Sequence, residues 1–76
     1  MAAQITYVHI SSSNNVDSRV AAVDIVEEID FWQGVTLEVV SVAGEQELVY
    51  RMETDGAISE TNLARLTNAG ATYQQF

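Results

Sequence analysis

Closely spaced carboxylates are the side chains of this sequence whose type and spacing suggest chemistry. Asp24, Glu27 and Glu28 stand three and four residues apart, so on a helix they would be neighbours at about 5–6 Å. Such a cluster could stay a solvated surface, bind a hard cation such as Ca²⁺ or Mg²⁺, or imitate nucleic-acid phosphates toward a basic protein surface. The sequence has no loop with densely spaced Asp and Asn residues, which disfavours a metal site.

The recognition hypothesis adds three residues to this cluster. Phe31 lies near the polar side of the same predicted helix and would supply an apolar anchor. Two further glutamates stand at the tip of a predicted hairpin and extend the acidic field. The predicted partner-binding residues are therefore Asp24, Glu27, Glu28, Phe31, Glu45 and Glu47.

The other reactive side chains match no enzymatic motif. His9 is the only histidine and stands within a predicted strand, and no serine and carboxylate spacing indicates a catalytic triad. Zinc sites need several His or Cys ligands, and the sequence has no cysteine. The four glycines are each isolated at a predicted element boundary, unlike those of a phosphate-binding loop. We expect a non-enzymatic protein without a metal or cofactor.

The overall charge limits the possible partners. Eleven acidic residues face three arginines and no lysine, which gives a net charge of −8. A charge of this size on a small body repels nucleic-acid backbones and anionic membranes and attracts a basic protein. The alternative is that acidity only keeps the protein soluble or adapts it to high salt.

Length and composition predict one small folded domain spanning residues 1–76. The hydrophobic fraction of 47% is that of a globular protein. No apolar run approaches the roughly 18 residues of a membrane-spanning helix, and the N-terminus lacks the basic and apolar regions of a signal peptide. We therefore expect a cytoplasmic protein, of a host cell if it is encoded by a phage.

Two helices are predicted. Residues 17–32 carry one apolar stripe, with Asn15 or Asp17 as the N-cap and Gly34 where the helix ends. A strand is the alternative for this segment, because it is rich in valine and isoleucine, but a strand would bring an acidic residue onto its apolar side. The second helix follows Ser59 and ends at Gly70. The stripe of the first helix comprises Ser18, Ala22, Ile25, Val26, Ile29 and Trp32.

Alternating apolar residues predict the strands. Residues 4–10 are apolar on both sides, as in a central strand. Residues 34–53 alternate on both sides of a break at residues 43–45 and indicate a β-hairpin. Residues 71–76 contain Tyr73 and Phe76, which predict either a short edge strand or a tail that covers the edge of the core.

The order β-α-β-β-α, with a possible final β, predicts an α+β domain of the split βαβ (ferredoxin-like) type, with two helices on one face of an antiparallel sheet. Residues 4–10 would then lie between the second hairpin strand and residues 71–76. The opposite sheet face would be open, with Ile5, Tyr7 and Val49 as its apolar residues. We predict an acidic inhibitor that occupies the basic, nucleic-acid-binding surface of a partner, as phage-encoded anti-restriction and anti-CRISPR proteins do. The alternative is an interaction module that forms a homodimer through the open face.

Overall fold

A computed structural model describes residues 3–40 and 47–76 of the chain. The predicted tip of the hairpin, with Glu45, lies outside the described residues. The observed order is β-α-β-β-α-β, so residues 71–76 do contain a strand. The elements are β1 (Ala3–Ile10), α1 (Val16–Gln33), β2 (Gly34–Val39), β3 (Leu48–Asp55), α2 (Glu60–Asn68) and β4 (Thr72–Gln75).

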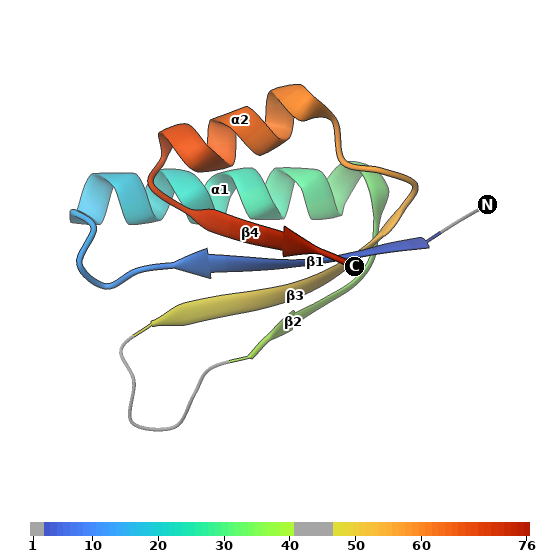
Figure 1. Cartoon of the computed structure of the whole chain (residues 1–76), viewed down its shortest axis with the longest axis horizontal. Helices are drawn as coiled ribbons and strands as arrows, with labels where there is room; N and C mark the ends of the chain where they lie inside the picture. Colours follow the sequence, from blue (N-terminus) through green and yellow to red (C-terminus); the bar gives the residue numbers. More distant parts are fainter. Residues whose placement is uncertain (1–2, 41–46) are drawn as a thin grey trace.

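The four strands form one antiparallel sheet in the order β2-β3-β1-β4. β1 lies between β3 and β4, as the handedness of the connections predicts. Both helices cover one face of the sheet and run antiparallel to each other (Figure 1). The predicted ferredoxin-like fold is therefore confirmed.

The core lies between the helices and the inner face of β1 and β3. Alternate residues of these strands are buried, so the period of two in the sequence does separate the two faces of the sheet. Leu66 of α2, Ile58 before that helix, and Ala69 and Ala71 after it complete the core. The strand and α1 residues that it contains are Val8, Ile10, Tyr50, Met52, Ala22, Ile25, Val26 and Ile29.

Side-chain caps start both helices where the sequence predicts. The Asn15 side chain accepts a hydrogen bond from the backbone N–H of Ser18 at 2.8 Å. The Ser59 side chain accepts one from the backbone N–H of Asn62 at 3.2 Å. Each cap satisfies a donor that the first helical turn leaves unpaired, which fixes where the helix begins.

The prediction for Trp32 was wrong, because this side chain is 76% exposed instead of buried in the stripe. Trp32 belongs to the last turn of α1, which has 18 residues against nine in α2. Figure 1 shows α1 continuing past the start of α2. The apolar periodicity of α1 therefore extends one turn beyond the part of the helix that other elements cover, and Trp32 stands in that uncovered turn.

β2 is the less buried strand of the hairpin. Leu37 is half-buried, whereas Val35 and Val39 are 56% and 61% exposed. The strand lies at the sheet edge, and its pairing with β3 shifts in register between Gly34 and Thr36. Consequently β3 contributes more buried apolar side chains to the core than β2 does. No helix of the described residues is long and apolar enough to cross a membrane.

Candidate functional site

The outward face of α1 combines carboxylates with an exposed aromatic ring. Asp24, Glu27 and Phe31 are spaced i, i+3 and i+7, which places them on one side of the helix. That side is opposite Ala22 and Ile29, so all three side chains are exposed. Within residues 3–40 and 47–76, neither Asp24 nor Glu27 forms an ion pair. We call Asp24, Glu27 and Phe31 the α1 surface.

Two aromatic rings project at the end of this surface. Phe31 is 79% exposed. Its ring meets that of Trp32 edge to face, with centroids 5.2 Å apart and an interplanar angle of 87°. Large apolar side chains that are exposed next to one another mark interaction surfaces more often than single exposed ones. The two rings therefore add an exposed apolar patch, whose hydration is unfavourable, to the end of the α1 surface.

The field of Glu27 also reaches the sheet. The pKa of Tyr50 on β3 is raised, first because the hydroxyl is partly buried and second because the negative charge of Glu27 disfavours a tyrosinate. Glu27 therefore lies close enough to Tyr50 to disfavour the ionisation of its hydroxyl.

Glu28 is placed differently from its two acidic neighbours. Its Oε2 accepts a hydrogen bond from the Arg65 guanidinium of α2 at 3.0 Å, and Arg65 also donates to Asn62 Oδ1 at 3.1 Å. The charge of Glu28 is thus matched by a cation, and its side chain links the two helices. We therefore leave it out of the α1 surface.

Glu47 lies with the loop between β1 and α1. Its carboxylate accepts hydrogen bonds from the Ser12 N–H at 2.7 Å and from the Ser11 hydroxyl at 3.5 Å. His9 Nε2 lies 3.3 Å from Glu47 Oε2. The Ser12 hydrogen bond chiefly, with a further contribution from His9, lowers the pKa of Glu47 below its ordinary value of 4.5. This glutamate is therefore engaged within the protein.

Among the residues that the structure describes, no three or more His, Asp or Glu side chains are grouped to hold a metal ion.

A second candidate site lies on the open face of the sheet. The strand registers arrange its side chains in rows that cross β3, β1 and β4. The middle row is Arg51, Tyr7 and Gln74. The row on one side of it is Val49, His9 and Thr72, and the row on the other side contains Ile5 with Phe76 next to it.

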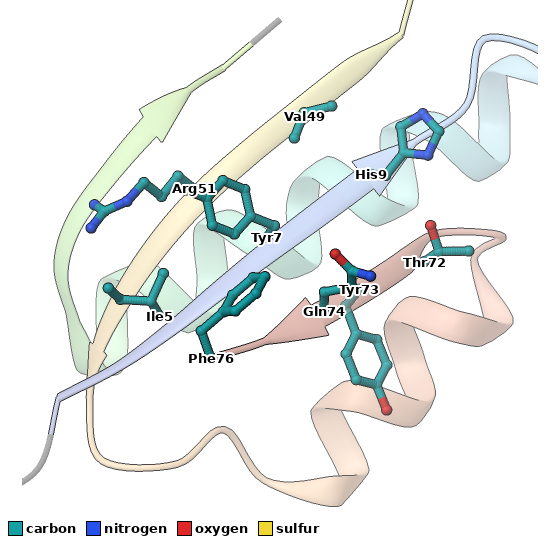
Figure 2. Close-up of a pocket in the computed structure, with 9 residues that line it drawn as sticks. All are labelled: Ile5, Tyr7, His9, Val49, Arg51, Thr72, Tyr73, Gln74 and Phe76. Atoms are coloured by element: carbon teal, nitrogen blue, oxygen red, sulfur yellow. The ribbon is translucent and has the colours of Figure 1, made fainter.

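These rows line a shallow hollow of about 760 Å³ that is open to solvent (Figure 2). The rings of Tyr7 and Phe76 meet edge to face at a centroid distance of 5.5 Å and an angle of 85°. Tyr73 also borders the hollow, but Figure 2 shows its ring turned away from those two rings. The hollow is therefore mostly apolar, with a few polar groups at its edges.

Arg51 is a candidate site residue that the sequence analysis does not single out. It stands between Tyr50 and Met52, both buried, so strand alternation alone places it on the open face. What alternation does not show is that Arg51 has neither an ion pair nor a side-chain hydrogen bond among the described residues.

Comparison with known proteins supports the fold. No protein-family model matches the sequence, and no curated protein matches it. Similar solved structures include the following two. One is a formyltetrahydrofolate deformylase from Pseudomonas putida KT2440, with a TM-score of 0.64 and 15% identity over 99% of this chain. The other is an uncharacterized protein from Thermotoga maritima, with a TM-score of 0.62 and 9% identity over 97% of this chain.

The two similar structures differ in how much of them this chain covers. It spans 28% of the deformylase chain and 92% of the Thermotoga protein. At 15% and 9% identity the likeness concerns the fold, and a fold of this type hosts many unrelated functions.

Proposed function

We propose that this chain is a non-enzymatic binding protein whose α1 surface docks onto a basic surface of another protein, where that protein would otherwise bind nucleic acid. The proposal rests mainly on one observation. Phe31, 79% exposed, lies one and two turns from Glu27 and Asp24, and neither carboxylate is paired with a cation within the described residues.

The two kinds of side chain have complementary roles in such an interface. An aromatic ring that loses its water on binding supplies much of the affinity of a typical interface. The surrounding carboxylates would meet lysines and arginines, which speeds association and selects basic partners. The net charge of −8 extends this attraction beyond direct contact.

The spacing of the carboxylates is compatible with imitation of a phosphate backbone. Asp24 and Glu27 are about 4.5 Å apart along the helix axis, at about 1.5 Å per residue. Successive phosphates of one DNA strand advance by about 3.4 Å along the duplex axis. The two spacings are of the same order, so cations arranged for successive phosphates would lie near these carboxylates.

Displacement of DNA tests the proposal. Proteins eluted from a DNA-cellulose column supply basic nucleic-acid-binding surfaces, and a short fluorescent duplex reports whether these surfaces are occupied. We expect the chain to displace the duplex at low salt and to lose potency as salt rises, because screening weakens exposed charge pairs. The Asp24→Asn/Glu27→Gln double variant should need on the order of tenfold more protein for the same displacement.

A matched control separates the α1 surface from net charge. Glu38→Gln/Glu53→Gln removes the same two charges from the open sheet face, since both residues alternate with inward-facing neighbours. This control should retain the potency of the unchanged chain. Equal losses in both double variants would show that net charge alone is responsible and would contradict the proposal. A potency that does not change with salt would contradict an electrostatic mechanism.

A further inference from the structure

We propose that the open face of the sheet binds a small aromatic carboxylate, with Arg51 receiving the carboxylate and the rings of Tyr7 and Phe76 receiving the aromatic body. This site lies on the side of the sheet opposite the helices (Figure 2). It does not depend on docking by the α1 surface.

The shape of the face favours a small ligand. The hollow of about 760 Å³ falls within the roughly 300–1,000 Å³ of small-molecule sites, which are mostly apolar with a few placed polar groups. A second copy of the chain would fit less well. A two-fold interface sets the same patch against itself, so two hollows would face each other and leave their centre unfilled.

The basic side chains in the hollow favour an anionic ligand. Of the residues that line the hollow, Arg51 and His9 carry these basic groups, and His9 already faces Glu47 at 3.3 Å. Glu38 and Glu53 stand on the same face of the sheet but do not line the hollow. Arg51 has no ion pair or side-chain hydrogen bond among the described residues, although the chain has eleven acidic residues. Glu38 stands opposite Arg51 on β2, but the two do not form an ion pair. A planar guanidinium without an ion pair is suited to a carboxylate, which it binds through two parallel hydrogen bonds.

The register sets the distance between the anionic and aromatic parts of the ligand. Tyr7 stands directly opposite Arg51, and side chains so paired have Cβ atoms about 4.5–5.5 Å apart. The perpendicular rings of Tyr7 and Phe76 offer a face and an edge, the two surfaces that a third ring prefers to contact. A carboxylate held one or two bonds from an aromatic ring, as in arylacetates, matches this geometry.

Three ligands with the same ring test the proposal. Indole-3-acetate, indole-3-acetamide and tryptamine carry a negative, a neutral and a positive group, and each is titrated into the ¹⁵N-labelled chain while amide shifts are followed by NMR. We expect indole-3-acetate to bind with a Kd on the order of 1 mM or tighter. It should bind on the order of tenfold more tightly than the acetamide, with the largest shifts at Tyr7, Arg51 and Gln74. Tryptamine should bind most weakly.

Variants assign the roles of the residues. Arg51→Gln should bring the affinities of the acetate and the acetamide to about the same value, and Arg65→Gln, which changes an arginine on α2, should keep their ratio. Phe76→Ala should weaken both ligands alike. Because the ratio between acetate and acetamide is also measured in the unchanged chain, the test does not depend on any variant folding.

Three results would overturn the proposal. The first is equal affinity of the unchanged chain for acetate and acetamide. The second is a set of ligand-induced shifts confined to α1. The third is a dimer, seen by light scattering, in which the amide shifts of Tyr7 and Gln74 change with protein concentration, since a second copy would then occupy the face.

Discussion

The outward side of α1 and the open side of the sheet both expose aromatic rings, yet the charged groups next to these rings are of opposite sign. On α1, Phe31 accompanies carboxylates that have no cationic partner among the described residues. On the sheet, Tyr7 and Phe76 accompany Arg51, which has no anionic partner there. Because Glu38 and Glu53 also stand on the open face, the two surfaces differ in the charge next to their rings and not in the charge of the whole face.

The rings of the two surfaces are also held differently. Phe31 meets Trp32, its neighbour in the chain, whereas Tyr7 of β1 meets Phe76, which follows β4. The first ring pair needs only the helix that carries it. The second needs the pairing of β1 with β4. Stability should consequently depend on the sheet rings more than on the helix rings.

Gly34→Ala should have the largest effect, because it disrupts the junction between α1 and β2 and with it both surfaces. A Cβ at this position would come within 2.7 Å of Asp30 Cα, a backbone atom of the last turns of α1. We expect a loss of about 2–3 kcal/mol in the free energy of unfolding, measured by urea denaturation. Gly56→Ala is the control: its Cβ meets open space, so only the positive φ of 85° remains, at about 1–2 kcal/mol. A smaller loss for Gly34→Ala than for the control would contradict the clash.

Tyr7→Ala and Phe31→Ala compare the ring pairs directly. Tyr7 is half-buried among cross-strand neighbours, so its removal should lower the free energy of unfolding by about 1–2 kcal/mol. Phe31→Ala should change it by less than about 0.5 kcal/mol. Thermal and urea unfolding of both variants measure the difference. Equal losses of unfolding free energy in the two variants would contradict the expectation that the sheet rings contribute more to stability than the helix rings.

Glu47→Gln gives the smallest effect and concerns pH. Because the pKa of Glu47 is lowered in the folded protein from 4.5, its carboxylate stabilises the fold above that value, and this contribution is lost as pH falls through the folded-state pKa. The variant should therefore be less stable than the unchanged chain at neutral pH and equally stable in strong acid. Urea denaturation across the acid range measures the difference, and a constant difference at every pH would contradict this role for Glu47.

The elements could be predicted from the sequence because their signals are local. The caps at Asn15 and Ser59 act within three residues, and the burial of β1 and β3 follows simple alternation. The order of the strands in the sheet could also be predicted, since the handedness of the connections allows few strand orders. Trp32 shows where local patterns fail, because periodicity does not reveal where the covering layer ends.

The candidate sites could be predicted only in part, because they depend on contacts between distant segments. Glu28 and Arg65 are 37 residues apart, and Ser12 and Glu47 are 35 apart. No pattern within α1 shows that one carboxylate is matched by a cation while Asp24 is not. Likewise, alternation places Arg51 on the open face, but the hollow there is made by β1, β3 and β4 together.

The order of the strands also has a consequence for how the chain acquires its structure. β1 precedes the other strands in the sequence and occupies the middle of the sheet, yet its partners β3 and β4 begin only at Leu48 and Thr72. Pairings this distant in sequence form slowly, because closing a long loop costs entropy before the contacts form. During synthesis, both edges of β1 therefore stay unpaired until β3 and β4 have been made, and we expect the β2–β3 hairpin to form before β1 joins the sheet.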